Sequence, residues 1–586
     1  MKMSILKVNK LLVQLRLIFS TVGFLLNLRN PNNIKAIFIV LILILCNFSS
    51  YSQGGVYVNA NNTVYEFLEK MNTKGVIDYS KVIMPKTRYE IFDYLSEIKN
   101  SPTQLTKIER QELDWYFKEF FYENRNNIVG TEDSKLMFLK TPKDDRWNFF
   151  EYYDSTFHIM LNPIIGASYG LIYNQTNLKR WTGLSTYFSL GENWGGNFNY
   201  RDNWEKGDHL LQNKIFTDET GIEVIKSSED NIEYSDVNGS VGFESKYVNV
   251  AIGKDYFNWG SGNRSQLILS DKAPSFPYIR LDIKPVHWMR FYYIHGFLNS
   301  RIPDSSAYYN TQLPNSDSTY VQRKIDRPKF YAAHILEFKI KKRIIFSIGE
   351  SVVYSDQGPR AGYLIPVIFF RLVDHYYEGT GGFGKGSNSQ IFFDLNVGLL
   401  KKFNFYGTLF VDEFSLSKFL KGNHDRDHIG YTLGVNTYAL LPNFGFTAEY
   451  TRIRPWVYSN FVQTQTYENS NYLMGHYIGQ NSDQLYLKSY YTILRGLNAS
   501  VWYEHIRRGG FDPVEYQYKD PGEEFLYGKR RIESNIGVNI SYQPFHDVFI
   551  NGYYTFSDIS DEDENRTPNY QLGNTSSYGI TVAYGF

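Results

Sequence analysis

Large apolar and small side chains alternate through the last ten residues of the chain. Tyr578, Ile580, Val582, Tyr584 and Phe586 are separated by Gly, Thr and Ala. Successive side chains of a β-strand point to opposite faces, so this segment predicts one apolar face and one small, mildly polar face. Such a final strand is typical of an outer-membrane β-barrel, in which the apolar face contacts lipid and the small face lines the lumen.

The same alternation repeats upstream, with long and short connections in turn. Tight turns are predicted at 543–546, 495–496, 441–443 and 401–402, and long loops at 557–576, 507–533, 455–483 and 416–428. Long loops at one end and tight turns at the other are expected of an outer-membrane barrel. Continued to residue 154, the pattern predicts an all-β transmembrane barrel of roughly 18 antiparallel strands over residues 150–586. The alternative, a soluble β-sandwich or propeller, is less favoured because we find no internal repeat of ~40 to 50 residues.

A different periodicity precedes the barrel. Between residues 53 and 130 apolar residues recur at helical spacing, as in Val64, Phe67, Leu68 and Met71. Thr87 with Glu90, and Thr106 with Glu109, have the spacing of a capping box, and Gly75 is placed to end the first helix. We therefore predict a small domain of three helices, located in the periplasm, that plugs the barrel or docks beneath it.

An apolar run from Ala36 to Cys46 lies near the N-terminus, after Lys35. The run is too short to span ~30 Å of hydrocarbon as a helix. It fits the core of a signal peptide, which we place at residues 1–52. In an alternative interpretation Cys46 is an acylated lipoprotein cysteine, but Leu45 occupies the position that requires a small residue.

Composition narrows the function further. Aromatic residues make up 17% of the chain, with 49 Tyr, which suits the boundaries of a membrane. The formal net charge is +0, which removes electrostatic attraction to nucleic acid as an expected function. The histidines are scattered, and the adjacent carboxylates Asp412 and Glu413 should point to opposite faces of a strand. We therefore expect no enzymatic activity, no catalytic residues, no bound metal and no cofactor.

The densest polar and aromatic segment runs from Gly253 to Pro277. By the strand count it is an external loop that folds near or into the mouth of the barrel. Trp259, Arg264 and Asp271 would suit sugar recognition, with an aromatic face against a pyranose ring and charged groups on hydroxyls or uronates. In the alternative interpretation the segment only packs inside the barrel and narrows it.

Four pieces of the chain together carry a family resemblance. They are Asp255–Gly262 (DYFNWGSG), Leu267–Pro274 (LILSDKAP), Gly407–Phe414 (GTLFVDEF) and Met474–Gly479 (MGHYIG). They resemble the signature of the Wzi-type capsule assembly barrels. The resemblance implies a non-enzymatic outer-membrane protein that associates surface polysaccharide with the cell. The candidate polysaccharide-binding residues are Trp259, Arg264, Asp271, Asp255, Asp412, Glu413 and His476.

The leading functional prediction is thus a barrel that binds or organises capsular or other surface polysaccharide. The Tyr-rich composition and the Tyr-Ser-Gln end of the signal also resemble Bacteroidetes-type exports, where related barrels are tied to gliding motility or adhesion. A structural part of a motility or adhesin-secretion apparatus is therefore a second hypothesis, and a porin is a third. The expected partners are surface polysaccharide, outer-membrane lipid and the barrel-assembly machinery, together with motility or secretion proteins under the second hypothesis.

Overall fold

The computed structural model describes residues 55–585, except 124–134, 139–145, 155, 192, 208–213, 215, 315–318, 379–385, 399, 401, 414–426, 439 and 520–521. The predicted signal peptide lies outside the described residues. Across the described ranges, no helix is long and apolar enough to cross a membrane.

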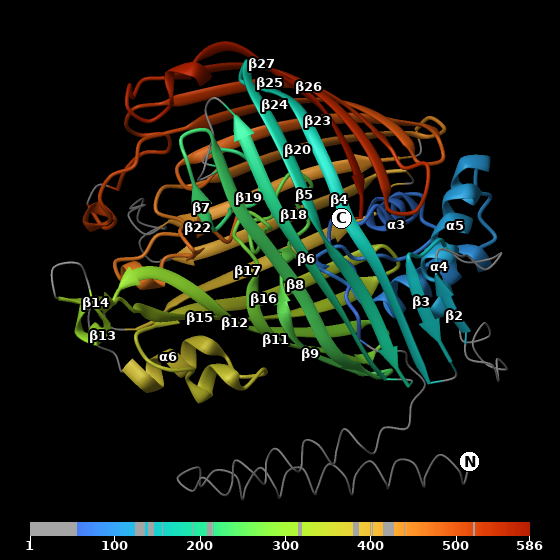
Figure 1. The fold of residues 1–586 in the computed structure, drawn as a ribbon, viewed down its shortest axis with the longest axis horizontal. Helices are drawn as coiled ribbons and strands as arrows, with labels where there is room; N and C mark the ends of the chain where they lie inside the picture. The colour runs from blue at the N-terminus through green and yellow to red at the C-terminus, as the bar shows by residue number, and fades with distance from the viewer. Residues whose placement is uncertain are drawn as a thin grey trace, which may run out of the picture. The chain divides into compact units, whose positions relative to one another are not determined.

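The described residues form a closed antiparallel barrel of eighteen strands (Figure 1), as the sequence predicts. Each strand pairs with the next along the wall, and the last pairs with the first, with Tyr578 opposite Leu171 and Tyr584 opposite Ile165. The strands are β4 (Phe157–Ile172), β5 (Gln175–Leu190), β6 (Trp194–Gly207), β8 (Asn231–Glu244), β9 (Val248–Asp255), β11 (Phe276–Val286), β12 (Met289–Pro303), β15 (Asp326–Lys341), β16 (Ile344–Ser355), β17 (Asn388–Val397), β18 (Asn404–Glu413), β19 (His428–Thr437), β20 (Phe444–Ile453), β23 (Ser482–Leu494), β24 (Leu497–Arg508), β25 (Arg531–Tyr542), β26 (Val548–Asp561) and β27 (Gly573–Tyr584).

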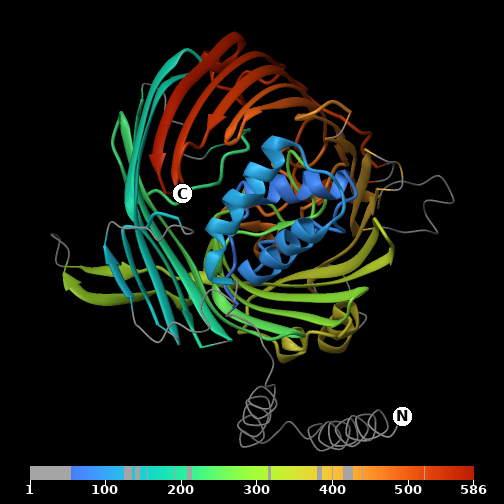
Figure 2. The same cartoon turned by 90° about the vertical axis from the view of Figure 1, so that its right-hand side faces the viewer.

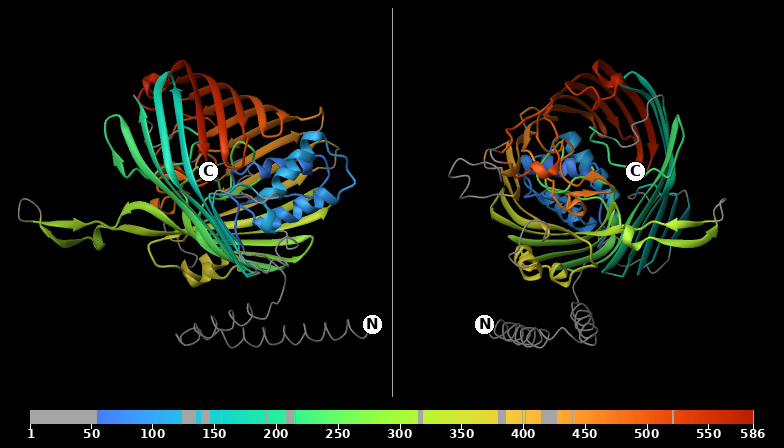
Figure 3. Two further views of the ribbon diagram at one scale, coloured as in Figure 1. Left: turned by 45° about the vertical axis from the view of Figure 1, so that its right-hand side comes forward. Right: turned by 90° about the vertical axis from the view of Figure 1, so that its left-hand side faces the viewer.

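Shorter strands lie at the edges of the wall and inside it. The β13–β14 hairpin projects beyond the wall (Figure 3). The short strands are β1 (Ile83–Met84), β2 (Lys135–Phe138), β3 (Phe150–Tyr153), β7 (Lys226–Ser227), β10 (Asn258–Trp259), β13 (Tyr309–Pro314), β14 (Tyr320–Arg323), β21 (Glu468–Asn469) and β22 (Tyr472–Leu473).

Side chains alternate between the two faces of the wall as predicted. On β25 the apolar residues Ile536, Val538 and Ile540 are exposed on the outside, and Ile580 and Val582 are exposed in the same way on β27. An apolar outer face is the surface that a barrel presents to acyl chains.

The connections are long at one end of the barrel and short at the other. The predicted turns at 543–546 and 495–496 both separate adjacent strands at the short-turn end. The predicted boundaries of the last loop, 557–576, are wrong, since β26 continues to Asp561 and β27 begins at Gly573. Beyond the apolar band a strand can carry polar side chains on both faces, so polarity alone does not end it.

In the described part of the chain before the wall, three α-helices form at the predicted places: α3 (Val64–Thr73), α4 (Arg88–Asn100) and α5 (Lys107–Glu119). The Thr87 side chain accepts a hydrogen bond from the backbone N–H of Glu90, and Thr106 forms a complete capping box with Glu109. Gly75 ends the first helix with φ of 75°, a conformation that glycine adopts without strain. The apolar stripes of the three helices pack on each other as a core.

The helical domain lies at the short-turn end, within the ring of strands (Figure 2). Glu90 of α4 contacts Lys284 at 3.2 Å, where β11 ends. Trp115 of α5 stacks on His546 in the turn before β26, with ring centroids 3.6 Å apart. The helical domain is therefore anchored to the barrel by contacts with its short turns.

Candidate functional site

The connection between β9 and β11, residues 256–275, folds into the lumen. Its short strand β10 pairs with β1, which comes from the helical domain at the opposite end, with Trp259 opposite Ile83. The backbone N–H of Trp259 donates to the carbonyl of Leu269 at 2.8 Å, and the backbone N–H of Gly260 donates to the carbonyl of Val82 at 2.8 Å. A segment from the long-loop end and a segment from the short-turn end therefore meet inside the barrel.

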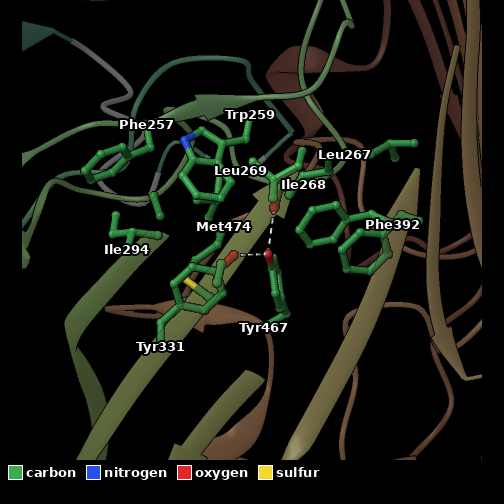
Figure 4. Close-up of a cluster of buried hydrophobic side chains, with 14 of the residues drawn as sticks. Phe257, Trp259, Leu267, Ile268, Leu269, Ile294, Tyr331, Phe392, Tyr467 and Met474 are labelled. Atoms are coloured by element: carbon green, nitrogen blue, oxygen red, sulfur yellow. Dashed lines mark hydrogen bonds between the residues drawn. The ribbon is translucent and has the colours of Figure 1, made fainter. Parts of the chain in front are cut away.

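An apolar core surrounds this meeting point (Figure 4). The Tyr467 hydroxyl donates to the carbonyl of Ile268 at 2.7 Å and bonds the Tyr331 hydroxyl at 3.0 Å. The Tyr458 hydroxyl donates to the carbonyl of Leu267 at 2.8 Å. These hydrogen bonds satisfy backbone groups that would otherwise be buried without partners. The core lies inside the lumen and is built from both segments.

Several of the predicted site residues are buried in or near this core. Trp259 is 0% exposed and lies among aliphatic and aromatic side chains. His476 is also fully buried, and burial, with Arg264 and Arg508 nearby, lowers its pKa to about 3, so its ring is neutral at physiological pH. Asp255 is buried at the end of β9, where it accepts a hydrogen bond from the backbone N–H of Tyr256 at 2.8 Å.

Asp412 and Glu413 lie at the loop end of β18 and have separate partners. Asp412 accepts hydrogen bonds from the Tyr458 N–H at 2.7 Å and from the Gln390 amide at 3.2 Å. Glu413 accepts one from the Tyr518 hydroxyl at 2.6 Å. A register irregularity interrupts the pairing of β18 at this point. Asp412 and Glu413 therefore hold connections at the long-loop end in place.

Arg264 lies on a cavity of about 330 Å³ inside the barrel, and we call it the arginine cavity. Its Nε donates to Glu504 at 2.6 Å, and its Nη1 contacts Asp218. The guanidinium also lies over three aromatic rings, Tyr477, Tyr486 and Trp502, at 5.5, 5.4 and 5.7 Å from their centroids. Two carboxylates and three aromatic rings therefore surround the Arg264 guanidinium.

The charge of Arg264 is fixed by its neighbours. Burial alone would lower the pKa of the guanidinium, but the carboxylates of Asp218 and Glu504 outweigh it and raise that pKa above its usual value. The arginine cavity is within the range of about 300–1,000 Å³ that is common for ligand sites.

Asp271 lies on a second cavity, of about 630 Å³, beside the inner wall of β4 to β8. The lining includes the inward side chains of Asn162, Asn197, Asn199 and Asn238. Burial, followed by the charge of Asp218, raises the pKa of Asp271 to about 6. Lys214 and Glu219 line both cavities, so the two cavities adjoin at these side chains.

Sequence reasoning selected Arg264 and Asp271 but missed most of the arginine cavity. Tyr486, Trp502 and Glu504 were not selected, although a signal was available. The exposed residues Leu485 and Val501 mark the outer face of β23 and β24, which places their neighbours Tyr486 and Trp502 toward the lumen. Inward-facing aromatic residues on wall strands are therefore the sequence signal of this cavity. Within the described ranges, no group of three or more His, Cys, Asp or Glu side chains is arranged to hold a metal ion.

The comparisons with known proteins agree with this architecture. Residues 160–572 match the family model of the capsule assembly protein Wzi. The Escherichia coli outer membrane protein Wzi, described as a carbohydrate-binding β-barrel involved in group 1 capsule assembly, is similar at 12% identity with a TM-score of 0.54, over 90% of this chain and 100% of that one. Pseudomonas aeruginosa OprD is similar at 10% identity with a TM-score of 0.39, over 73% of this chain and 94% of that one. No curated protein sequence matches the chain. The chain belongs to the Wzi family of capsule assembly proteins, and its eighteen-strand wall is an outer-membrane barrel.

Proposed function

We propose that this barrel binds surface polysaccharide in the arginine cavity and holds it at the cell without chemical turnover. Membership of the capsule assembly family and the carbohydrate-binding description of the Escherichia coli protein support the proposal. The helical domain then faces the periplasm, because short turns lie on that side of outer-membrane barrels.

The observation that carries the proposal is the set of ring faces around Arg264. A pyranose ring presents apolar C–H groups that pack on aromatic faces, and its hydroxyls donate to carboxylates. Trp502 and Tyr553 offer rings to the arginine cavity, and Glu504 and Asp218 offer acceptors. Trp259 is enclosed in the core, so we assign it to packing and leave it out of the proposed binding surface.

The charges of the arginine cavity favour neutral, hydroxyl-rich sugars over uronates. Both cations that line the cavity already contact carboxylates. Lys214 lies 3.0 Å from Glu205 and 3.3 Å from Glu219. Arg264 contacts Asp218 and Glu504. An incoming uronate would therefore approach carboxylates whose cations are already paired. A neutral sugar is not repelled by these carboxylates.

A matched pair of neighbouring tyrosines tests the proposal. Tyr553 lines the arginine cavity, whereas Tyr554 is exposed on the outer face of the same strand. Loss of one stacking ring should weaken binding about 2- to 12-fold, since such contacts contribute about 0.5–1.5 kcal/mol. We expect Tyr553→Ala and Trp502→Ala to weaken the binding of polymer from the host cell to the purified barrel, and Tyr554→Ala to leave it unchanged. Heat-modifiable migration on gels checks that each barrel is folded.

Equal affinity of all three variants, each with a folded barrel, would contradict the arginine cavity as the binding site. Deletion of the gene tests the wider role, because unchanged attachment of surface polymer would contradict glycan retention. Loss of spreading with normal polymer attachment would instead favour the motility or adhesin-secretion hypothesis. The second cavity is lined by residues from both ends of the barrel, Gln543 and Asp547 at the short-turn end and Asn299 and Asn469 at the other, so single-channel conductance in planar bilayers is the test of the porin hypothesis.

A further inference from the structure

Residues 356–378, which follow β16, fold back over the outside of the wall (Figure 2). They contain the short helix η4 (Ala361–Leu364) and the helix α6 (Phe370–Glu378). In Figures 2 and 3 this helical piece lies outside the ring of strands, next to β15 and β16. The helical piece therefore covers a part of the outer face of the wall, which elsewhere is open to the membrane.

Alternation along β16 shows which face the helix covers. Val353 lies in the lumen core with Trp259. Its neighbours Val352 and Tyr354 belong to a separate cluster with Tyr363, Phe370 and Val373. Because adjacent side chains of a strand point to opposite faces, the cluster beneath α6 lies on the outer face. Tyr354 is one residue from the end of β16, so this contact lies at the long-loop rim.

The helix covers polar groups on that outer face. Glu350 points outward with Val352 and is only 3% exposed. Its Oε1 accepts a hydrogen bond from the Phe370 N–H at 2.6 Å, and its carboxylate lies 3.2 Å from His334 Nε2. A charged side chain on a lipid-contacting face is unfavourable unless it has partners. The helical piece supplies the partner and separates the carboxylate from the acyl chains.

The side of this piece that faces away from the wall is itself apolar. Val367 is 76% exposed and Leu372 is 63% exposed, with Phe369 and Ile365 also exposed. Ile279 and Phe297, on the outer face of β11 and β12 nearby, are exposed as well. The exposed side of the piece is therefore continuous with apolar wall residues that face lipid.

We propose that α6 and the residues before it form an interfacial element that is embedded in the outer leaflet, with acyl chains covering Val367 and Leu372. Arg371 is exposed beside Leu372 and can reach the headgroup region, as cations do on helices that lie at a membrane interface. The element widens the lipid-contacting surface of the barrel on the side of β12, β15 and β16. This inference does not depend on glycan binding.

Spin labels test the position of the element directly. Cys46 is the only cysteine of the chain, so with Cys46→Ser a label can be placed at Leu372→Cys or Val367→Cys. Two reference labels represent a site in lipid and a site in water. Ile536→Cys lies on the lipid face of β25, and Phe511→Cys lies in the exposed connection after β24. The labelled barrels are reconstituted in vesicles of phosphatidylethanolamine and phosphatidylglycerol, and collisions with oxygen and with a water-soluble nickel chelate are measured.

We expect the labels at residues 367 and 372 to resemble the label at residue 536, with at least a several-fold excess of oxygen over nickel collisions. Labels that resemble the one at residue 511 would overturn the proposal, because the element would then lie in water. Labels shielded from both reagents would also overturn it, because a protein rather than lipid would cover the helix. Heat-modifiable migration confirms that each labelled barrel is folded.

Discussion

Trp259 joins two segments that enter the barrel from opposite ends. Replacing it with alanine would leave a cavity beside Ile83 in the core, and such changes cost about 3–5 kcal/mol. We expect Trp259→Ala to lower the midpoint of thermal unfolding markedly. Trp288→Ala, in an exposed turn, should lower it little. Unchanged unfolding together with weaker glycan binding would show instead that Trp259 contacts the ligand.

The two candidate roles of this segment could not be separated from the sequence. Trp259 and Arg264 are five residues apart in one polar and aromatic stretch, yet the first is enclosed in the core and the second lies on a cavity. The difference arises from pairing with Ile83, about 175 residues earlier, which no local pattern reveals. The face on which each wall residue lies is predictable from alternation. How far residues 256–275 enter the lumen is not.

At the scale of elements, the buried carboxylate of Glu90 joins α4 to the barrel. Glu90 contacts Arg290, Lys284 at 3.2 Å and Lys86 at 3.5 Å. Removing one partner of a buried ion pair typically costs about 3–5 kcal/mol, because the remaining charges stay buried. We expect Glu90→Gln to speed hydrogen exchange in α4 at least tenfold, whereas Glu97→Gln, exposed on the same helix, should not. Equal exchange in both variants would show that apolar contacts alone hold the helix.

The same carboxylate gives the docking of α4 a dependence on pH. Burial alone would raise the pKa of Glu90, but Lys284, Lys86 and Arg290 outweigh it and hold the pKa well below its ordinary value of 4.5. Its contribution is therefore complete above pH 4.5 and is lost as the pH falls through the lower folded pKa. We expect the protection of the α4 amides, taken relative to the intrinsic exchange rate at each pH, to fall on acidification below pH 4.5 in the native chain. Glu90→Gln should show a smaller fall in protection, and equal acid sensitivity would place the responsible group elsewhere.

The elements differ in how well local pattern predicts them. The helices of the small domain were predictable because each carries an apolar stripe and a capping signal. The helix α6 was not, because its apolar residues lie in a loop, and only the fold shows that they cover the outer wall. The ends of β26 and β27 were also predicted too short, since they extend beyond the apolar band.

For the whole molecule, the number of strands and the asymmetry of the loops followed from alternation and spacing. Closure of the ring depends on one seam, between β27 and β4, which joins the two ends of the wall. Inside the lumen, a piece of the helical domain pairs with a piece of a long connection. This pairing joins segments that are far apart in the chain, so the local periodicity of the sequence does not predict it.

The seam makes a further prediction about the assembled barrel. A Cβ atom added at Gly170, on β4, would lie 2.0 Å from the carbonyl oxygen of Tyr578 on β27, so the two strands would have to separate. At Gly552, on β26, the nearest atom to an added Cβ is 4.0 Å away. Because overpacking of this kind costs about 1–3 kcal/mol, Gly170→Ala should lower the temperature at which the heat-modifiable band is lost, whereas Gly552→Ala should not. If both variants keep the native transition, the seam tolerates local separation, and closure must rest on the contacts of the lumen core with the wall rather than on the register of the last strand.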